Sequence, residues 1–211
     1  MIRRILLPVD ASEHSRAAAR FAEDLARAHR ATIYALGVVD VPGIERSACT
    51  AGAGASHYSR DLRQRRLDEA RRTLGEFLVQ LEADMGSRGV PVACFHDAGS
   101  VHEVITERSL TTDIVVVARH INFQFETSDK PGDTLFQLLE MTSRLTMVVP
   151  DEHRPIRTLV LAHDMSKTCA RVMYMMTHLR PFPGSDYIIV HADSDGMYGE
   201  EDFDDGIDYL A

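Results

Sequence analysis

The chain is poor in cysteine, in long apolar runs and in basic charge. Its three cysteines, Cys49, Cys94 and Cys169, have no C-x-x-C spacing, so we expect reduced thiols rather than a disulfide framework. No apolar run approaches the roughly 18 residues that a membrane-spanning helix needs. The opening segment MIRRILLPVD begins like a signal peptide, but Pro8 and Asp10 end its apolar stretch too early. These absences indicate a cytoplasmic protein without membrane contact.

The shortage of basic charge excludes a class of partner. The formal net charge is −9, and eight acidic residues lie between Asp193 and Ala211, where there is no Lys or Arg. The remaining 24 acidic and 23 basic residues nearly cancel. Nonspecific nucleic-acid binding needs clustered Lys and Arg, so we expect no nucleic-acid partner.

Signatures of catalysis and of metal binding are missing as well. The chain has no G-x-S-x-G motif, and no cysteine stands beside a recognisable catalytic partner. Ten histidines are present, but none has a zinc-type spacing to another ligand. We therefore expect no metal and no enzymatic activity, while weak nucleotide hydrolysis is left open.

What the chain does contain is an alternation of short β-branched runs with amphipathic helical stretches. The small-residue segment 42–56 is predicted to be a mobile loop. Helices are predicted from Ser12, over 59–85, after Ser100 and over 133–143. Strands are predicted at 4–9, 31–39, 90–95, 113–118 and 145–150. Strands that alternate with helices indicate an α/β protein with an open five-stranded parallel sheet, flavodoxin-like or Rossmann-like.

The chain then repeats part of itself. RILLPVDAS (4–12) aligns with TLVLAHDMS (158–166), so that an Asp-x-Ser sequence ends both segments. YALGVVD (34–40) aligns with YIIVHAD (187–193), with a shift of one residue. A polar, proline-ended joint separates the copies. We therefore predict a domain at 1–150, a linker at 151–155, a partial second β-α-β copy at 156–193 and an acidic tail at 194–211.

The partial copy indicates an oligomer. A β-α-β unit cannot satisfy both edges of its two-stranded sheet. Its helix is apolar nearly all round, with Val172, Met173, Tyr174, Met175 and Met176 in succession. We predict that this helix buries more than one side, against the first domain, a second subunit or another protein, and that a symmetric homodimer completes the sheet. Truncation of a two-domain relative would give the same sequence, and this alternative stays open.

The first forty residues resemble a known family. ILLPVDASEHSRAAARFAEDLARAHRATIYALGVVD is similar to the opening of the universal stress protein family, and DIVVVARH and TMVVP match its fourth and fifth strands. The resemblance implies a sheet of the adenine nucleotide alpha hydrolase-like type, dimerisation through the fifth strand and a role in stress response. It covers one full domain plus the partial copy.

Many members of that family bind ATP through a Gly-x-x-Gly-x9-Gly-Ser/Thr loop after strand four. Here Ala118 and Ile121 stand in the first two glycine places, and Gly132 comes one residue late, before Asp133 and Thr134. A β-branched residue resists positive φ, and an aspartate at a helix start competes with phosphate for the free N–H groups. The loop is therefore similar to the family branch with a degraded ATP loop.

The segment around Asp10, at the end of the first predicted strand, leaves two interpretations open. The resemblance places the Pro-Val-Asp turn and the end of strand two around an adenine, whereas Asp10 could instead hold the strand–helix turn. The candidate nucleotide residues are Pro8, Val9, Asp10, Val39, Ala118, Arg119, Ile121, Gly132, Asp133 and Thr134.

We expect a non-catalytic stress-type protein without a cofactor. It would act through a homodimer, built on strand five and the partial copy, and through contacts with a protein partner that the sequence does not identify. The alternative is a stress sensor that binds ATP or AMP at the candidate residues.

Overall fold

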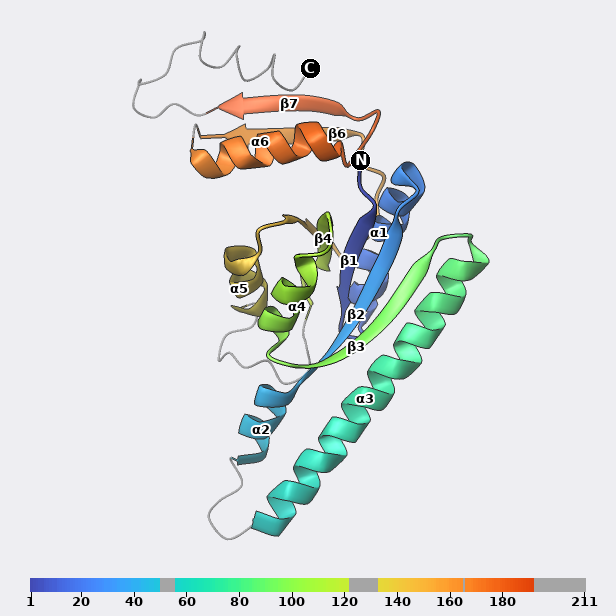
Figure 1. Ribbon diagram of the computed structural model, residues 1–211, viewed down its shortest axis with the longest axis vertical. Helices are drawn as coiled ribbons and strands as arrows, with labels where there is room; N and C mark the ends of the chain where they lie inside the picture. Colours follow the sequence, from blue (N-terminus) through green and yellow to red (C-terminus); the bar gives the residue numbers. More distant parts are fainter. Residues whose placement is uncertain (50–55, 122–132, 165, 192–211) are drawn as a thin grey trace. The chain divides into compact units, whose positions relative to one another are not determined.

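The chain forms two compact units, each with strands that alternate with helices (Figure 1). The computed structural model describes residues 1–49, 56–121, 133–164 and 166–191. The first unit comprises Arg3–His153, and the second comprises Met1–Ile2 with the chain from Arg154 onward. Among the residues described, no helix is both long and apolar enough to cross a membrane. The predicted acidic tail lies outside these residues.

The first unit is built on an open parallel sheet. Its order is β3-β2-β1-β4-β5, and all neighbouring pairs are parallel. Its strands are β1 (Arg4–Val9), β2 (Thr32–Asp40), β3 (Val92–Gly99), β4 (Ile114–Ala118) and β5 (Leu145–Val149). The predicted five-stranded parallel α/β sheet is confirmed. Because β1 connects toward β2 while β4 follows on its other side, the chain changes direction at the carboxyl ends of β1 and β4.

Helices cover both faces of this sheet. Among the described residues, α1 (Glu13–His29), α3 (Ser56–Ser87) and α4 (Val101–Ser109) contact the strands, and α5 (Asp133–Met141) packs beside α4. Arg88 on the loop after α3 donates to Glu23 on α1 at 2.7 Å, which holds α1 and α3 beside each other. Helix α4 contacts α5. Right-handed crossovers place these two pairs on opposite faces of the sheet.

Local sequence explains the strand–helix alternation. The central strand β1 is buried along its length after Arg4, as a short apolar run in a parallel sheet should be. The helix begins after Ser12, as predicted from the sequence, and Ser12 is its N-cap, since its Oγ accepts from the Ser15 N–H at 3.2 Å. The fully buried Ala18 and Ala22 let α1 lie close to the sheet.

The segment predicted as a mobile loop, 42–56, instead begins with a helix, α2 (Val41–Cys49). Asp40 accepts a hydrogen bond from the Gly43 N–H at 3.1 Å through Oδ1, in the manner of an N-cap. Proline is tolerated in a first helical turn, and Ile44 is fully buried against α3. The prediction was wrong for 42–49 because these contacts outweigh the small-residue composition, and residues 50–55 lie outside the described residues.

The third strand is longer than the predicted 90–95. Its residues His96–Gly99 pair in register with Gly37–Asp40 of β2. Polar side chains concealed this extension in the sequence, but an edge strand with one solvent-facing side accommodates them.

The described part of the second unit contains two parallel strands and one helix. These are β6 (Thr158–His163), α6 (Lys167–Leu179) and β7 (Asp186–His191). Ser166 caps α6 by accepting from the Cys169 N–H at 3.1 Å, which repeats the cap of α1. The identity of this unit as a partial second copy stays a prediction.

Helix α6 buries one side within the single chain, and burial of a second side against another chain stays a prediction. Its buried residues are Met173 and Met176, whereas Tyr174 is 54% exposed and Val172 is 37% exposed. A two-stranded sheet is wide enough to cover only one face of a helix, so the remaining apolar side chains face outward.

Candidate functional site

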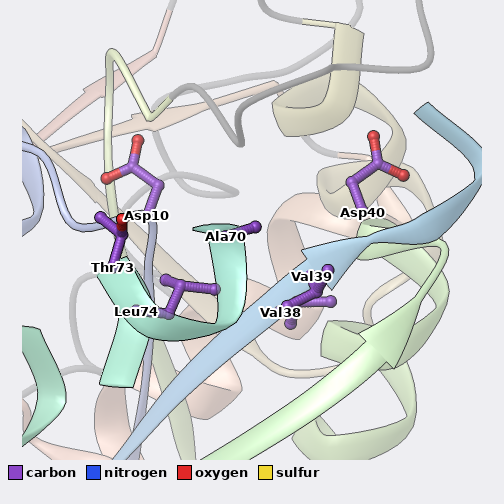
Figure 2. Close-up of a pocket in the computed structure, with 7 residues that line it drawn as sticks. All are labelled: Asp10, Val38, Val39, Asp40, Ala70, Thr73 and Leu74. Carbon is purple, nitrogen blue, oxygen red and sulfur yellow. The ribbon is translucent and has the colours of Figure 1, made fainter. Parts of the chain in front are cut away.

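A small pocket lies at the carboxyl ends of β1 and β2, where open α/β sheets bind their ligands. Residues of β2, of the turn after β1 and of α3 line it (Figure 2). In the view of Figure 2, the Ala70 side chain lies between those of Asp10 and Asp40. The lining residues are Asp10, Val38, Val39, Asp40, Ala70, Thr73 and Leu74.

Asp10 holds the turn between β1 and α1. Its Oδ1 accepts from the Ser12 N–H at 3.0 Å, from the Ser12 hydroxyl at 2.5 Å and from the Ser15 hydroxyl at 2.5 Å. Ala11, which lies between Asp10 and Ser12, has a φ of 65°. This is a left-handed conformation that the hydrogen bonds of Asp10 stabilise. The turn-forming interpretation of Asp10 is therefore correct, and the carboxylate also lines the pocket.

Asp40 has a less complete environment. It is 3% exposed, and its Oδ2 is buried without a hydrogen-bond partner in the described structure. Burial raises the pKa of Asp40 above its ordinary 3.8, while the Gly43 N–H and the charges of Arg46 and His102 act in the opposite direction. An unpartnered buried oxygen of this kind is suited to a donor from a ligand or a water.

The pocket is nearly closed by α3. Leu67 and Leu74 pack with Val39 and Ile44 in one buried cluster, and Ala70 packs against it. The remaining cavity volume is about 20 Å³, which holds roughly one water molecule. The cavity is therefore too small to enclose an adenine ring.

The structure brings few of the candidate nucleotide residues together. Asp10 and Val39 line the pocket, whereas Pro8 and Val9 are buried within β1. Ala118, Arg119, Ile121 and Thr134 do not line it.

After β4 the candidate residues alternate between the interior and the surface. Ala118 and Ile121 are buried, Arg119 is exposed, and Thr134 is 4% exposed in the first turn of α5. Gly132 lies outside the described residues, and Asp133 is the first residue of α5.

A second constellation lies at the ends of β4 and β5, and sequence reasoning missed it. His14 and His120 each place Nδ1 at 2.8 Å from an oxygen of Asp151. The hydrogen bond with His120, and the charges of His120 and His14, lower the pKa of Asp151 below its ordinary 3.8. These residues are far apart in the chain, so no local spacing could have revealed them.

The thiol of Cys94, on β3, is not activated as a nucleophile. Burial, with the charge of Glu82 in addition, raises the pKa of Cys94 to about 11. Its thiol is therefore protonated at neutral pH.

The fold and the strand-end pocket define an open, doubly wound α/β protein. A sequence profile described as the Universal stress protein family matches residues 1–123, more than half of the chain. The chain therefore belongs to the universal stress protein family. No curated protein matches it significantly in sequence.

Two solved structures share the fold. The universal stress protein UspA from Lactobacillus plantarum is 18% identical, with a TM-score of 0.55, over 70% of this chain and 97% of that chain. A universal stress protein from Archaeoglobus fulgidus is 18% identical, with a TM-score of 0.71, over 97% of this chain and 72% of that chain. At this identity the likeness concerns the fold alone.

Proposed function

We propose that this protein is a non-catalytic, cytoplasmic stress-response protein that acts through a homodimer and through protein contacts, without ATP. The stress role rests on family membership. The mode of action rests on the surface around β5, which is an edge strand of the sheet. An edge strand offers unpaired backbone groups to a second chain.

The observation that carries this proposal is the apolar character of that edge. We call the exposed hydrophobic side chains of α5 and β5 the β5-edge surface. It consists of Phe136 (67% exposed), Leu139 (40%), Met141 (48%) and Val148 (37%). Phe136 and Leu139 share one helix face, since they are three residues apart. Three of the four side chains belong to α5, a helix of nine residues, and exposed apolar residues that lie close together are typical of protein interfaces.

The second unit offers a similar surface. Val160 and Ile188 are partners in the β6–β7 register, and Val190 lies two residues further along the same face. They are 62%, 50% and 48% exposed. An uncovered apolar sheet face supports a role for the partial copy in the proposed dimer.

The experiment is a size measurement by sedimentation velocity on the full chain and two variants. We expect a dimer for the parent protein. Val148→Glu should weaken association at least about tenfold, because a charge enters a desolvated interface. Val79→Glu is the matched control, since Val79 is a 67% exposed hydrophobic residue on α3 and should leave the dimer intact. A monomeric parent, or a Val148→Glu variant that dimerises normally, would contradict the proposal.

A specific observation favours a second candidate, an adenine-nucleotide sensor. The unpartnered Asp40 Oδ2 is an acceptor that the exocyclic amine of adenine could satisfy, at the strand ends where Asp10 also lies. Such binding requires α3 to open the 20 Å³ cavity. The substitutions at Ala118 and Ile121 argue against a phosphate cradle, because backbone N–H groups that hold phosphate favour glycine.

Calorimetric titration with ATP, AMP and adenosine, with and without magnesium, separates the two candidates. We expect no heat from any of them. Micromolar ATP binding would overturn the proposal and establish the sensor. Binding of adenosine or AMP without ATP would support an adenine pocket beside a blocked phosphate site. Leu74→Ala enlarges the pocket and provides a variant in which adenosine binding should strengthen if the site is the one described.

A further inference from the structure

The second constellation joins three segments at the carboxyl edge of the sheet. We call His14, His120 and Asp151 the His–Asp–His cluster. His14 lies in the first turn of α1, His120 follows β4 and Asp151 follows β5. All three belong to the first unit.

Sheet pairing sets the positions of two members. Ala118 of β4 is paired with Val149 of β5, and the Arg119 N–H donates to the Val149 carbonyl at 2.8 Å. His120 and Asp151 each come two residues after that pair, so the parallel register delivers them to the same level beyond the sheet. The Ser12 cap fixes the start of α1, and thereby His14, beside them.

The donor atoms of the cluster converge. His14 Nδ1 lies 2.8 Å from Asp151 Oδ1, and His120 Nδ1 lies 2.8 Å from Asp151 Oδ2. One ligand atom from each residue lies within 4.8 Å of the other two. The imidazole rings are 5.7 Å apart and inclined at 62°, so they approach edge to face rather than stacking.

We propose that the His–Asp–His cluster is a binding site for a divalent transition-metal ion, with Zn²⁺ as the preferred ion. Two imidazole nitrogens and one carboxylate oxygen form a ligand set that Zn²⁺ takes, with water in the fourth position. This inference does not depend on the proposed dimer or on nucleotide binding.

The geometry needs little adjustment to accept the ion. Ligand atoms about 2.0–2.1 Å from a tetrahedral Zn²⁺ lie about 3.4 Å from one another. In the cluster each imidazole nitrogen lies 2.8 Å from a different Asp151 oxygen, and one ligand atom from each of the three residues lies within 4.8 Å of the others. The side chains are 40% (His14), 58% (His120) and 42% (Asp151) exposed, so they can adjust their positions around an ion without disturbing the core. The ion would replace the protons that the imidazoles now share with the carboxylate.

The neighbouring His153–Asp24 pair provides a comparison. His153 Nε2 lies 2.7 Å from Asp24 Oδ2, but this is a one-to-one pair on the surface of α1. Neither the His153–Asp24 pair nor the pairs within the cluster should contribute much to stability, because exposed ion pairs are weak. What distinguishes the His–Asp–His cluster is a second imidazole on the same carboxylate, which supplies the three ligands that an ion needs.

The test uses the full chain after treatment with a chelator, with Co²⁺ as a spectroscopic probe and Zn²⁺ as its competitor. We expect one Co²⁺ per chain with the intense visible absorption of a tetrahedral site, and displacement by Zn²⁺ in keeping with the order of metal affinities. His120→Gln and Asp151→Asn should each weaken metal binding at least tenfold. Loss of a residue that only orients a metal ligand commonly weakens binding by about 10–100-fold, and loss of a ligand itself should cost at least as much. Asp24→Asn is the matched control and should bind like the parent.

A second readout guards against variants that do not fold. Circular dichroism should show parent-like spectra for all variants, because the substituted side chains are exposed. Zn²⁺ should raise the Tm of the parent and of Asp24→Asn, but not that of Asp151→Asn, since only an ion that binds the folded state stabilises it. Equal metal binding by the parent and Asp151→Asn, or no tetrahedral Co²⁺ spectrum in the parent, would overturn the proposal.

Discussion

At the scale of single residues, three aspartates lie at or just beyond the carboxyl ends of strands and have different surroundings. Asp10 accepts several hydrogen bonds from a tight turn. Asp40 caps α2 with one oxygen and buries the other without a partner. Asp151 lies between two imidazoles. The same residue type therefore serves a turn, a helix cap and a proposed metal site, according to what the fold brings to it.

The raised pKa of Asp40 makes its contribution to stability dependent on pH. Because burial disfavours the carboxylate in the folded protein, ionisation destabilises the fold as pH rises from the unfolded value of about 3.9 through the raised folded value. Asp40→Asn keeps an acceptor for the Gly43 N–H but cannot ionise. Its free energy of unfolding, relative to the parent, should therefore increase from pH 4 to pH 7.

Urea unfolding of both proteins at several pH values checks this prediction. The comparison with the parent cancels groups that titrate identically in the two proteins. A difference that is constant over the pH range, or that falls as pH rises, would show that burial does not penalise the Asp40 carboxylate.

At the scale of elements, the two units begin their helices in the same way. In the first, the Ser12 N–H donates to Asp10 at 3.0 Å, and in the second the Ser166 N–H donates to Asp164 at 2.9 Å. Both helices end at an arginine in the left-handed conformation, Arg30 with φ 56° and Arg180 with φ 44°. This shared start and stop supports the prediction of a partial second copy.

The two turns differ in burial, and this provides a matched pair of substitutions. Asp10→Ala removes a buried acceptor of three hydrogen bonds and should destabilise the first unit by about 2 kcal/mol. Asp164→Ala removes an exposed acceptor and should cost less than about 1 kcal/mol. Denaturant unfolding followed by circular dichroism measures both. Equal costs would mean that burial of the Asp10 network adds nothing to the turn.

At the scale of the whole molecule, exposed apolar surface characterises both units. The first unit has a core of its own, with the β5-edge surface outside it, and the second has an uncovered sheet face. A second copy of the chain could cover these surfaces, and the sedimentation experiment with Val148→Glu tests this at the same scale. The strand-end pocket, in contrast, is nearly filled from within by α3.

The sequence by itself determined the strand–helix alternation, the parallel five-stranded sheet and the Ser12 cap. These features follow from local periodicity and from hydrogen bonds between residues a few positions apart, and such local patterns can be recognised in the sequence. It also indicated that Asp10 has a structural place at the end of β1, because an aspartate before a serine at a strand end can form a turn.

Only the tertiary structure decided the rest. Helix α2 forms because Ile44 finds a buried place against α3, and α3 reduces the pocket to one water's volume because Leu74 packs on Val39. His14, His120 and Asp151 meet because parallel pairing of β4 with β5 aligns residues 31 positions apart beside the start of α1. Contacts between distant segments depend on strand register and on packing, and local sequence patterns do not predict them.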